Sequence, residues 1–167
     1  MGGAPDVRRV VADDAARLRA LRIEMLADAP LAFLETLDEA AARPHEEFRR
    51  AIAARATGDD WAQFVADDGR RLVGHAAGMA ARESGTTLLV AVYVTPAHRG
   101  TGLLERLVEA VAHWSRAAGR HRLALEVVTG NNRAVRAYER LGFVDTGTRS
   151  PHPRIPVLTE LTMTREC

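Results

Sequence analysis

The chain has 167 residues, 47% of them hydrophobic and 27% charged, which is the usual balance of a globular protein and predicts one domain over residues 1–167. A net charge of +1 and an aromatic content of 5% do not favour nucleic-acid binding. The lone cysteine, Cys167, excludes an intrachain disulfide, the six histidines lack metal-ligand spacing, and no run of about eighteen apolar residues predicts a membrane span. We therefore expect a cytoplasmic protein without a metal, nucleic-acid or membrane partner.

The first 60 residues predict one strand and at least two helices. Valines among arginines over residues 6–11 are typical of a half-buried strand, and the apolar residues of 15–26 recur at helical spacing. Pro44, followed closely by two glutamates, predicts a second helix that runs to about residue 56. The segment 31–42 between these helices is compatible with either a loop or a short helix.

Residues 61–81 predict a β-hairpin. Two apolar runs, 61–66 and 71–81, flank the dipeptide Asp68-Gly69, which is a strong turn signal. Gly74 and Gly78 in the second run are typical of bends or bulges.

A strand, a glycine turn and a helix follow, and together they indicate an anion site. The unbroken apolar run 88–94 predicts a strand, over 86–95, that is buried on both faces, and apolar residues recur at helical spacing from Leu103 to Trp114. The first amides of such a helix lack partners and its dipole favours negative charge, so a phosphate group fits the turn. The alternative is a glycine turn that binds nothing, and neither a P-loop nor a dinucleotide-binding GxGxxG is present.

The rest of the chain repeats this order and then adds strands. A short strand over 122–128 leads into a helix over 133–141, and two more strands, 143–148 and 157–164, flank a proline-rich loop. This order predicts an α/β protein of mixed α+β type, with a mostly antiparallel mixed sheet of six to seven strands and helices on both faces.

Two motifs within residues 86–145 resemble the GCN5-related N-acetyltransferase (GNAT) superfamily. That family carries R/Q-x-x-G-x-G/A after a strand that ends in V-x-P, and here the turn reads Arg99-Gly100-Thr101-Gly102. It then carries N-x-x-A-x-x-x-Y-x-x-x-G-F, which matches the run from Asn131 to Phe143. Leu104 departs from the pattern, because the family usually has glycine or alanine there, so we expect a slightly remodelled turn.

The resemblance implies a GNAT-like fold with acetyl-CoA as cosubstrate. In that fold the strands 86–95 and 122–128 run parallel but splay apart, and the pantetheine arm lies between them as an added strand. Asn131 either contacts the cofactor or only caps its helix. The cofactor-binding residues that the resemblance implies are Val92, Val94, Arg99, Gly100, Thr101, Gly102, Leu103, Leu104 and Asn131.

Acyl transfer to an amine calls for a proton acceptor and a proton donor. Tyr138 is the candidate general acid by resemblance, and the alternative is a tyrosine packed between helix and sheet. Glu126 is the candidate base, because a carboxylate is unusual in an apolar strand and its spacing of twelve from Tyr138 resembles that of the ribosomal-protein N-terminal acetyltransferases. Alternatively, Glu126 points out of the open face of the sheet or pairs with an arginine, Arg122 or Arg133. Reserve candidates for the base are Glu83, His75 and Tyr93.

The resemblance therefore implies an N-acetyltransferase in which a primary amine attacks acetyl-CoA directly. The alternative is a non-catalytic acyl-CoA-binding sensor module, which Leu104 favours. The sequence leaves the acceptor open among a small amine, an amino acid, an antibiotic and a protein N-terminus. Related proteins are often dimers, so a homodimer is a further expectation.

Overall fold

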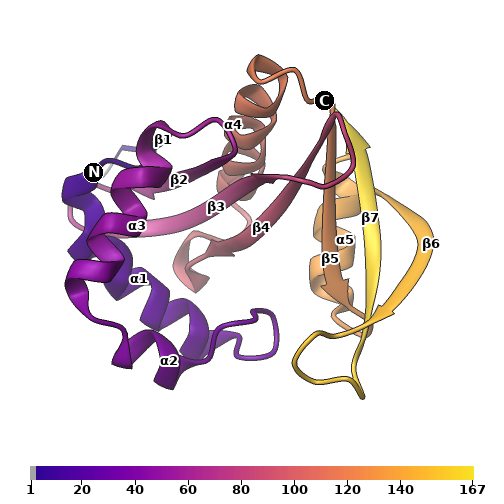
Figure 1. Ribbon diagram of the computed structural model, residues 1–167, viewed down its shortest axis with the longest axis horizontal. Coiled ribbons are helices and arrows are strands. Elements are labelled where there is room, and N and C mark those ends of the chain that lie inside the picture. Colours follow the sequence, from indigo (N-terminus) through magenta and orange to yellow (C-terminus); the bar gives the residue numbers. More distant parts are fainter. Residues whose placement is uncertain (1–2) are drawn as a thin grey trace.

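A seven-stranded mixed sheet forms the centre of the computed structural model, which describes residues 3–167 (Figure 1). The strands lie in the order β1-β2-β3-β4-β5-β7-β6, and every neighbouring pair is antiparallel except β4 and β5. The structure confirms the predicted mixed, mostly antiparallel sheet. Its strands are β1 (Asp6–Arg9), β2 (Trp61–Asp67), β3 (Leu72–Ala80), β4 (Thr86–Val94), β5 (Arg122–Val128), β6 (Val144–Pro151) and β7 (Thr159–Glu166).

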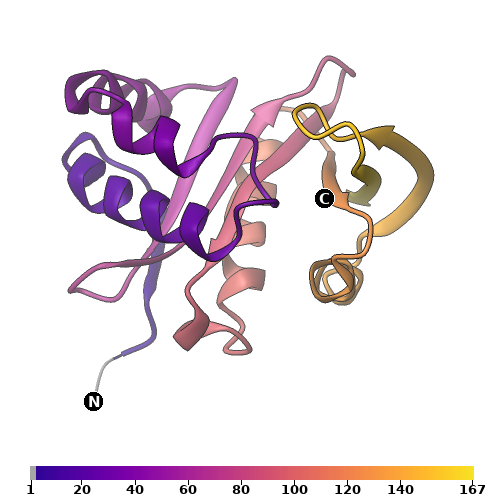
Figure 2. The same cartoon turned by 90° about the horizontal axis from the view of Figure 1, so that it is seen from below.

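Helices cover both faces of the sheet, as predicted (Figure 2). On one face, α1 and α3 bury apolar side chains such as Met25 and Ile52 against Val65 of β2. On the other face, α4 buries a continuous apolar stripe that includes Leu107 and Val111. The helices are α1 (Ala15–Asp28), α2 (Leu37–Ala42), α3 (His45–Thr57), α4 (Leu103–Ala117) and α5 (Asn132–Arg140), with 3-10 turns η1 (Ala12–Asp14) and η2 (Pro96–His98).

Two glycines of β3 have a further role beside the one predicted. The pairing of β2 with β3 skips Val73, so Gly74 borders a bulge, whereas Gly78 lies in regular pairing with both neighbouring strands. A Cβ atom on Gly78 would lie 2.7 Å from the Trp114 ring and one on Gly74 would lie 2.9 Å from Leu107. Glycine at these positions therefore lets α4 pack directly on the strand.

The parallel strands β4 and β5 separate soon after they meet. They pair only over Thr86–Leu88 of β4 and Arg122–Ala124 of β5, although both strands continue for several residues. Figure 1 shows the resulting V, which opens toward the loops that follow α1 and β6. Beyond the last pair, β4 is bent at Ala91, whose φ of 53° is unusual for a residue with a side chain. The splayed pair predicted from the family resemblance is present.

The segment left open between loop and helix contains the short helix α2. Thr36 and Glu39 form a capping box: the Thr36 hydroxyl accepts from the Glu39 amide, and the Glu39 carboxylate accepts from the Thr36 amide. These reciprocal bonds explain why a helix of only six residues begins at Leu37.

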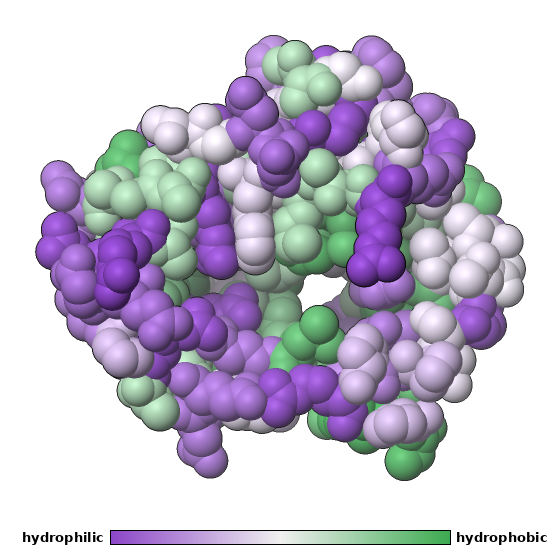
Figure 3. Space-filling model, in the orientation of Figure 1, coloured by the Kyte–Doolittle hydropathy of each residue, from purple (hydrophilic) through white to green (hydrophobic). Residues whose placement is uncertain are grey.

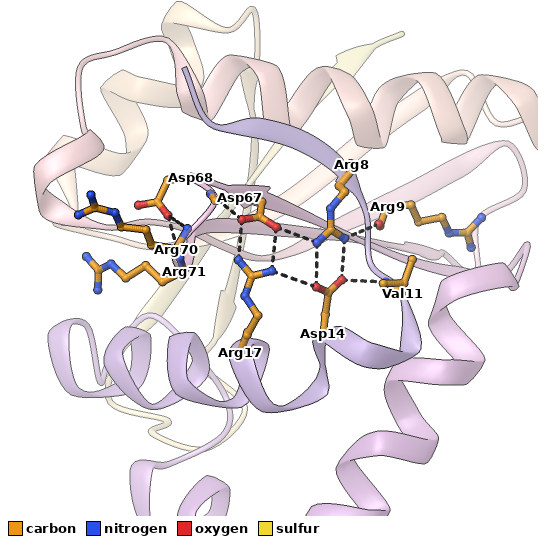
Figure 4. Close-up of polar contacts among 10 residues, drawn as sticks. Arg8, Arg9, Val11, Asp14, Arg17, Asp67, Asp68, Arg70 and Arg71 are labelled. Atoms are coloured by element: carbon orange, nitrogen blue, oxygen red, sulfur yellow. Dashed lines mark hydrogen bonds and ion pairs between the residues drawn. The ribbon is translucent and has the colours of Figure 1, made fainter. Parts of the chain in front are cut away.

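Four charged side chains connect β1, α1 and the end of β2 (Figure 4). The Arg8 guanidinium donates both to Asp14, at 2.6 and 2.8 Å, and to Asp67, at 2.9 Å. Arg17 donates to both carboxylate oxygens of Asp67, one of which it shares with Arg8. Asp14 is 3% exposed and also accepts from the Val11 amide, so its charge is both paired and hydrogen-bonded where the chain enters α1.

We expect Asp14→Asn to lower the free energy of unfolding by about 2 kcal/mol, because the variant leaves the partly buried Arg8 with one fewer counter-ion. The hydrogen bond from Arg8 holds the pKa of Asp14 below its usual value, so this stabilisation is present above about pH 4 and is lost as the pH falls further. Urea denaturation at pH 7 measures the difference, with the exposed neighbour variant Asp13→Asn as the control. Equal stability of the two variants would contradict the prediction.

Candidate active site

A cleft of about 1070 Å³ opens where β4 and β5 separate. Its walls come from α1, α3, the loop that follows α1, the bent part of β4, the start of α4, and α5. Figure 3 shows the molecule hollowed between its two halves, with hydrophobic surface beside the opening. The cleft thus brings together segments from both ends of the chain.

The glycine turn before α4 presents a row of free backbone donors. Gly100 and Gly102 have φ values of 75° and 81°, a conformation that favours glycine. The six amides from Gly100 to Glu105 donate to no backbone or side-chain acceptor among residues 3–167. Because they lie at the positive end of a fifteen-residue helix, they suit a diphosphate.

The side chains of this turn differ in their positions. Leu104 is half-buried and lines the cleft, whereas the Leu103 side chain is buried in the core, so only its amide is available. The Thr101 hydroxyl donates to the His98 carbonyl at 2.7 Å and shapes the turn itself.

Arg99 and Val94, both predicted to bind the cofactor, already have hydrogen-bond partners within the chain. The Arg99 guanidinium donates to the Val94 carbonyl at 3.0 Å and to the Asp28 carboxylate at the end of α1. These two bonds use Nε and Nη2 of Arg99, so a phosphate contact would fall mainly to Nη1. The local motif around Arg99 does not predict the contact with Asp28, because that residue is distant in the sequence. Val92 lies beside the bend of β4, is half-buried and lines the cleft.

Tyr138 of α5 lines the cleft, with its ring packed edge-to-face on Phe143 at a centroid distance of 5.7 Å. Its hydroxyl has no hydrogen-bond partner among the described residues. Burial raises the pKa of Tyr138, so the phenol is protonated at neutral pH and is a weaker acid than an exposed tyrosine. Asn131 also lines the cleft, but its side chain accepts from the Ala134 amide at 3.3 Å and caps α5.

Glu126 lies on β5 with an exposed side chain that lines the cleft. Arg122, one of its suggested partners, instead pairs with Glu83 and Glu166 at the surface. Glu83 is therefore engaged outside the cleft wall. Among residues 3–167, the structure records no ion pair of Glu126 with Arg133 either, so its carboxylate is available.

Glu160 is a second carboxylate in the cleft, and no sequence motif predicts it. It pairs with Val128 across β5 and β7, is 8% exposed, and has its Oε1 3.9 Å from Nε2 of His152. Burial and the nearby Glu126 charge raise the pKa of Glu160. His152 accepts backbone hydrogen bonds at Nδ1, so in its neutral form it carries its proton on Nε2, facing Glu160. Successive side chains of a strand point to opposite faces, so Glu160 lies on the face of β7 opposite to the buried residues Leu161 and Met163. The sequence shows this alternation, but it points to the cleft only once the pairing of β7 with β5 is known.

We call the part of the cleft between the separated strands β4 and β5 the slot. Away from the slot, the cleft continues under α1 and α3 into a pocket rich in arginine. Arg22 and Arg43 both donate to Glu35, whereas the guanidinium of Arg55 stacks 3.8 Å above the ring of Trp61. Three buried polar atoms of this region have no partner among residues 3–167: Trp61 Nε1, Gln63 Oε1 and His75 Nε2. Among the residues of this pocket, only His75 is a candidate site residue from the sequence.

His75 is held as a neutral imidazole. Its Nδ1 lies 2.7 Å from the Ala91 carbonyl, which can only accept, so Nδ1 carries the proton and Nε2 is an acceptor. Burial lowers the pKa of His75 to about 4. Tyr93, the other reserve candidate, donates its hydroxyl to Asp28 at 3.2 Å.

We expect His75 to make the protein less stable in acid. Its pKa is about 4 when folded and about 6.5 when unfolded, so the unfolded state binds more protons between these values. Stability is therefore full above about pH 6.5 and falls by about 3 kcal/mol as the pH approaches 4. Denaturation at pH 7 and pH 4.5 should show a smaller acid loss in His75→Gln than in the wild type. The surface variant His45→Gln should behave as the wild type, and an unchanged acid loss in His75→Gln would contradict the prediction.

Two loops are joined across the rim of the cleft by a contact that we call the clasp, made by Arg154, Glu39 and Leu34. Arg154 donates to both oxygens of Glu39, at 2.8 and 2.7 Å, and to the Leu34 carbonyl at 2.9 Å. The hydrogen bonds from Arg154 lower the pKa of Glu39 to about 2, so the pair stays charged at neutral pH. The clasp links the loop after α1 and the segment α2 to the loop between β6 and β7.

Comparison with known proteins identifies this architecture. A family model described as the acetyltransferase (GNAT) family matches residues 24–143, which is more than half of the chain. The chain therefore belongs to the GNAT acetyltransferase family. A search of curated proteins gave no match. In the part of the chain that the structure describes, no helix is long and apolar enough to span a membrane.

Solved structures share the fold over almost the whole chain. A GNAT-family acetyltransferase from Streptococcus pneumoniae has a TM-score of 0.79 at 22% identity, covering 96% of this chain and 98% of the other. YncA from Salmonella typhimurium, solved with its cofactor acetyl-CoA, has a TM-score of 0.75 at 20% identity, covering 98% and 94%. A ribosomal-protein-alanine N-acetyltransferase from Brucella melitensis has a TM-score of 0.77 at 21% identity, covering 97% and 99%. At these identities the likeness establishes the fold.

Proposed function

We propose that the chain, as one domain, transfers the acetyl group of acetyl-CoA to a primary amine. One observation supports this above the others: six partnerless amides at the start of α4 lie beside a strand, β4, whose edge is free from Leu89 onward. The turn would bind the diphosphate through amides from Gly100 to Leu104, and the edge near Val92 and Val94 would bind the pantetheine arm. Acetyl-CoA supplies an activated thioester.

The residues around the slot divide the proton transfers between them. Glu126 accepts a proton from the attacking ammonium or amine, directly or through water. A backbone N–H near Val92 stabilises the oxyanion as the nitrogen–carbon bond forms. Tyr138 donates its proton to the sulfur as the carbon–sulfur bond breaks, so the products are an amide and free coenzyme A thiol. No covalent enzyme intermediate is needed.

Thiol release from acetyl-CoA, measured against a panel of amines, tests the proposal. We expect release to depend on the amine and to be matched by the acetylated product in mass spectrometry. Coenzyme A alone should raise the melting temperature, because a ligand that binds only the folded state stabilises it. Heat protection without turnover of any amine would indicate instead an acyl-CoA-binding module, and failure of coenzyme A to protect the protein would exclude both functions.

A further inference from the structure

The pocket beside the slot contains a half-buried cation, Arg55, that forms no ion pair within residues 3–167. Of its three arginines, Arg22 and Arg43 share the carboxylate of Glu35, whereas Arg55 donates to no acceptor among residues 3–167. Arg55 lies against Trp61 instead, with its guanidinium carbon 3.8 Å from the ring centre. Burial and the charges of Arg22 and Arg43 lower the pKa of Arg55, and the charge of Glu35 opposes this shift only in part.

The same wall of the cleft contains buried hydrogen-bonding atoms that have no partner in the described part of the chain. Gln63 and His75 are 7% and 3% exposed, and each has one acceptor atom without a partner in the described part of the chain, Oε1 and Nε2 respectively. The Trp61 Nε1–H is a donor without a partner. Buried polar atoms are usually satisfied, so three in one ligand-sized cleft indicate groups that a ligand completes.

These groups have an order along the cleft. His75 bonds to Ala91, at the bend of β4 beside the slot, while Gln63 and Trp61 lie on β2, farther from the slot. Glu126 and Glu160 line the cleft from β5 and β7, across the gap. The cleft is therefore acidic on the side of the proposed base and basic under α1 and α3.

We infer that the acceptor is a free amino acid. Its carboxylate would bind Arg55 and the Trp61 indole N–H, while its amino group would reach the slot. This inference relies on the proposed acetyl transfer, whose acceptor it specifies. A carboxylate matches a guanidinium and an adjacent N–H donor in charge and geometry. N–H or O–H groups of the acceptor, between its two ends, would donate to Gln63 and His75. The acidic side of the cleft would attract the ammonium end of the same molecule.

Matched substrates and variants test the inference. The substrates are lysine against cadaverine and ornithine against putrescine, pairs that differ only by a carboxylate, with an aminoalkyl phosphate as a second anion. We expect Arg55→Gln to raise KM for the amino acids about 10- to 100-fold and to leave KM for the decarboxylated amines nearly unchanged. Arg49→Gln, on the exposed face of the same helix, should have no effect, because Arg49 contacts only Glu46. Arg55→Lys retains the charge and should show an intermediate KM.

The results distinguish this inference from the proposed function. A wild-type preference for decarboxylated amines or for the aminoalkyl phosphate would overturn the inference, as would an equal effect of Arg55→Gln on both members of a pair. If no amine is acetylated, the proposed function fails, and calorimetric titration of the amino acids still tests the pocket. Binding to the wild type and to Arg49→Gln, but not to Arg55→Gln of equal melting temperature, supports the carboxylate site, and no binding to the wild type overturns it.

Discussion

Replacing Tyr138 by phenylalanine should lower kcat by about 10²- to 10³-fold, the usual range for loss of a positioned general acid. The variant removes only a hydroxyl that has no hydrogen-bond partner in the described structure, so the fold and the ring contact with Phe143 should remain. Heat protection by coenzyme A should be unchanged, because the proposed cofactor contacts lie on β4 and the turn before α4. Steady-state kinetics with a saturating amine measures the loss.

The chain offers a matched control, since it has only one other tyrosine. Tyr93 also lines the cleft, but its hydroxyl is already bonded to Asp28. Tyr93→Phe should therefore retain most of the activity. An acyl donor with a more acidic thiol should reduce the difference between Tyr138→Phe and wild type, since a better leaving group needs less protonation. Equal activity of Tyr138→Phe and wild type would refute the assignment of the acid.

The second large effect concerns the base. We expect Glu126→Gln to lower kcat/KM about 100-fold at neutral pH, because most of the amine is protonated and the variant cannot remove the proton. The deficit should shrink as the pH rises toward the pKa of the amine. It should also be smaller for a weakly basic amine that is already neutral at the assay pH. A pH profile of kcat/KM for two amines of different basicity measures both effects.

Two other glutamates complete the experiment. Glu83→Gln is the control, because Glu83 pairs with Arg122 outside the cleft wall. Glu160→Gln tests the second carboxylate of the cleft, and we expect a smaller loss than in Glu126→Gln, since Glu160 is buried beside His152. Full activity in Glu126→Gln together with a large loss in Glu160→Gln would transfer the role of base to Glu160.

Local patterns predicted most of the fold, whereas contacts between distant segments were missed. The strands, the long helices and the family motifs depend on apolar spacing and turn residues, which are properties of neighbouring positions. The start of helix α2 can be predicted from the sequence, because Thr36 and Glu39 have the spacing of a capping box. The packing roles of Gly74 and Gly78 cannot be predicted in this way, because they depend on contacts with α4, which follows them in the chain.

In the candidate site, too, local motifs predict some residues, whereas contacts between distant segments reveal the others. Tyr138 and the glycine turn were found from motifs, and the structure places both in one cleft. The contact of Arg99 with Asp28 joins positions 71 residues apart, and Glu160 becomes visible only through its pairing with β5. The arginine pocket combines side chains from α1, α3 and the segments around α2, none of which forms a motif by itself.

The clasp between Arg154 and Glu39 spans the cleft on the side where β4 and β5 diverge. The paired ends of β4 and β5 close one end of the V, and the clasp bridges its open end. We therefore expect the bridge to hinder entry of a folded protein's terminus more than entry of a free amino acid. Because both partners of the bridge are exposed, salt weakens it, and the size limit on acceptors should relax as ionic strength rises.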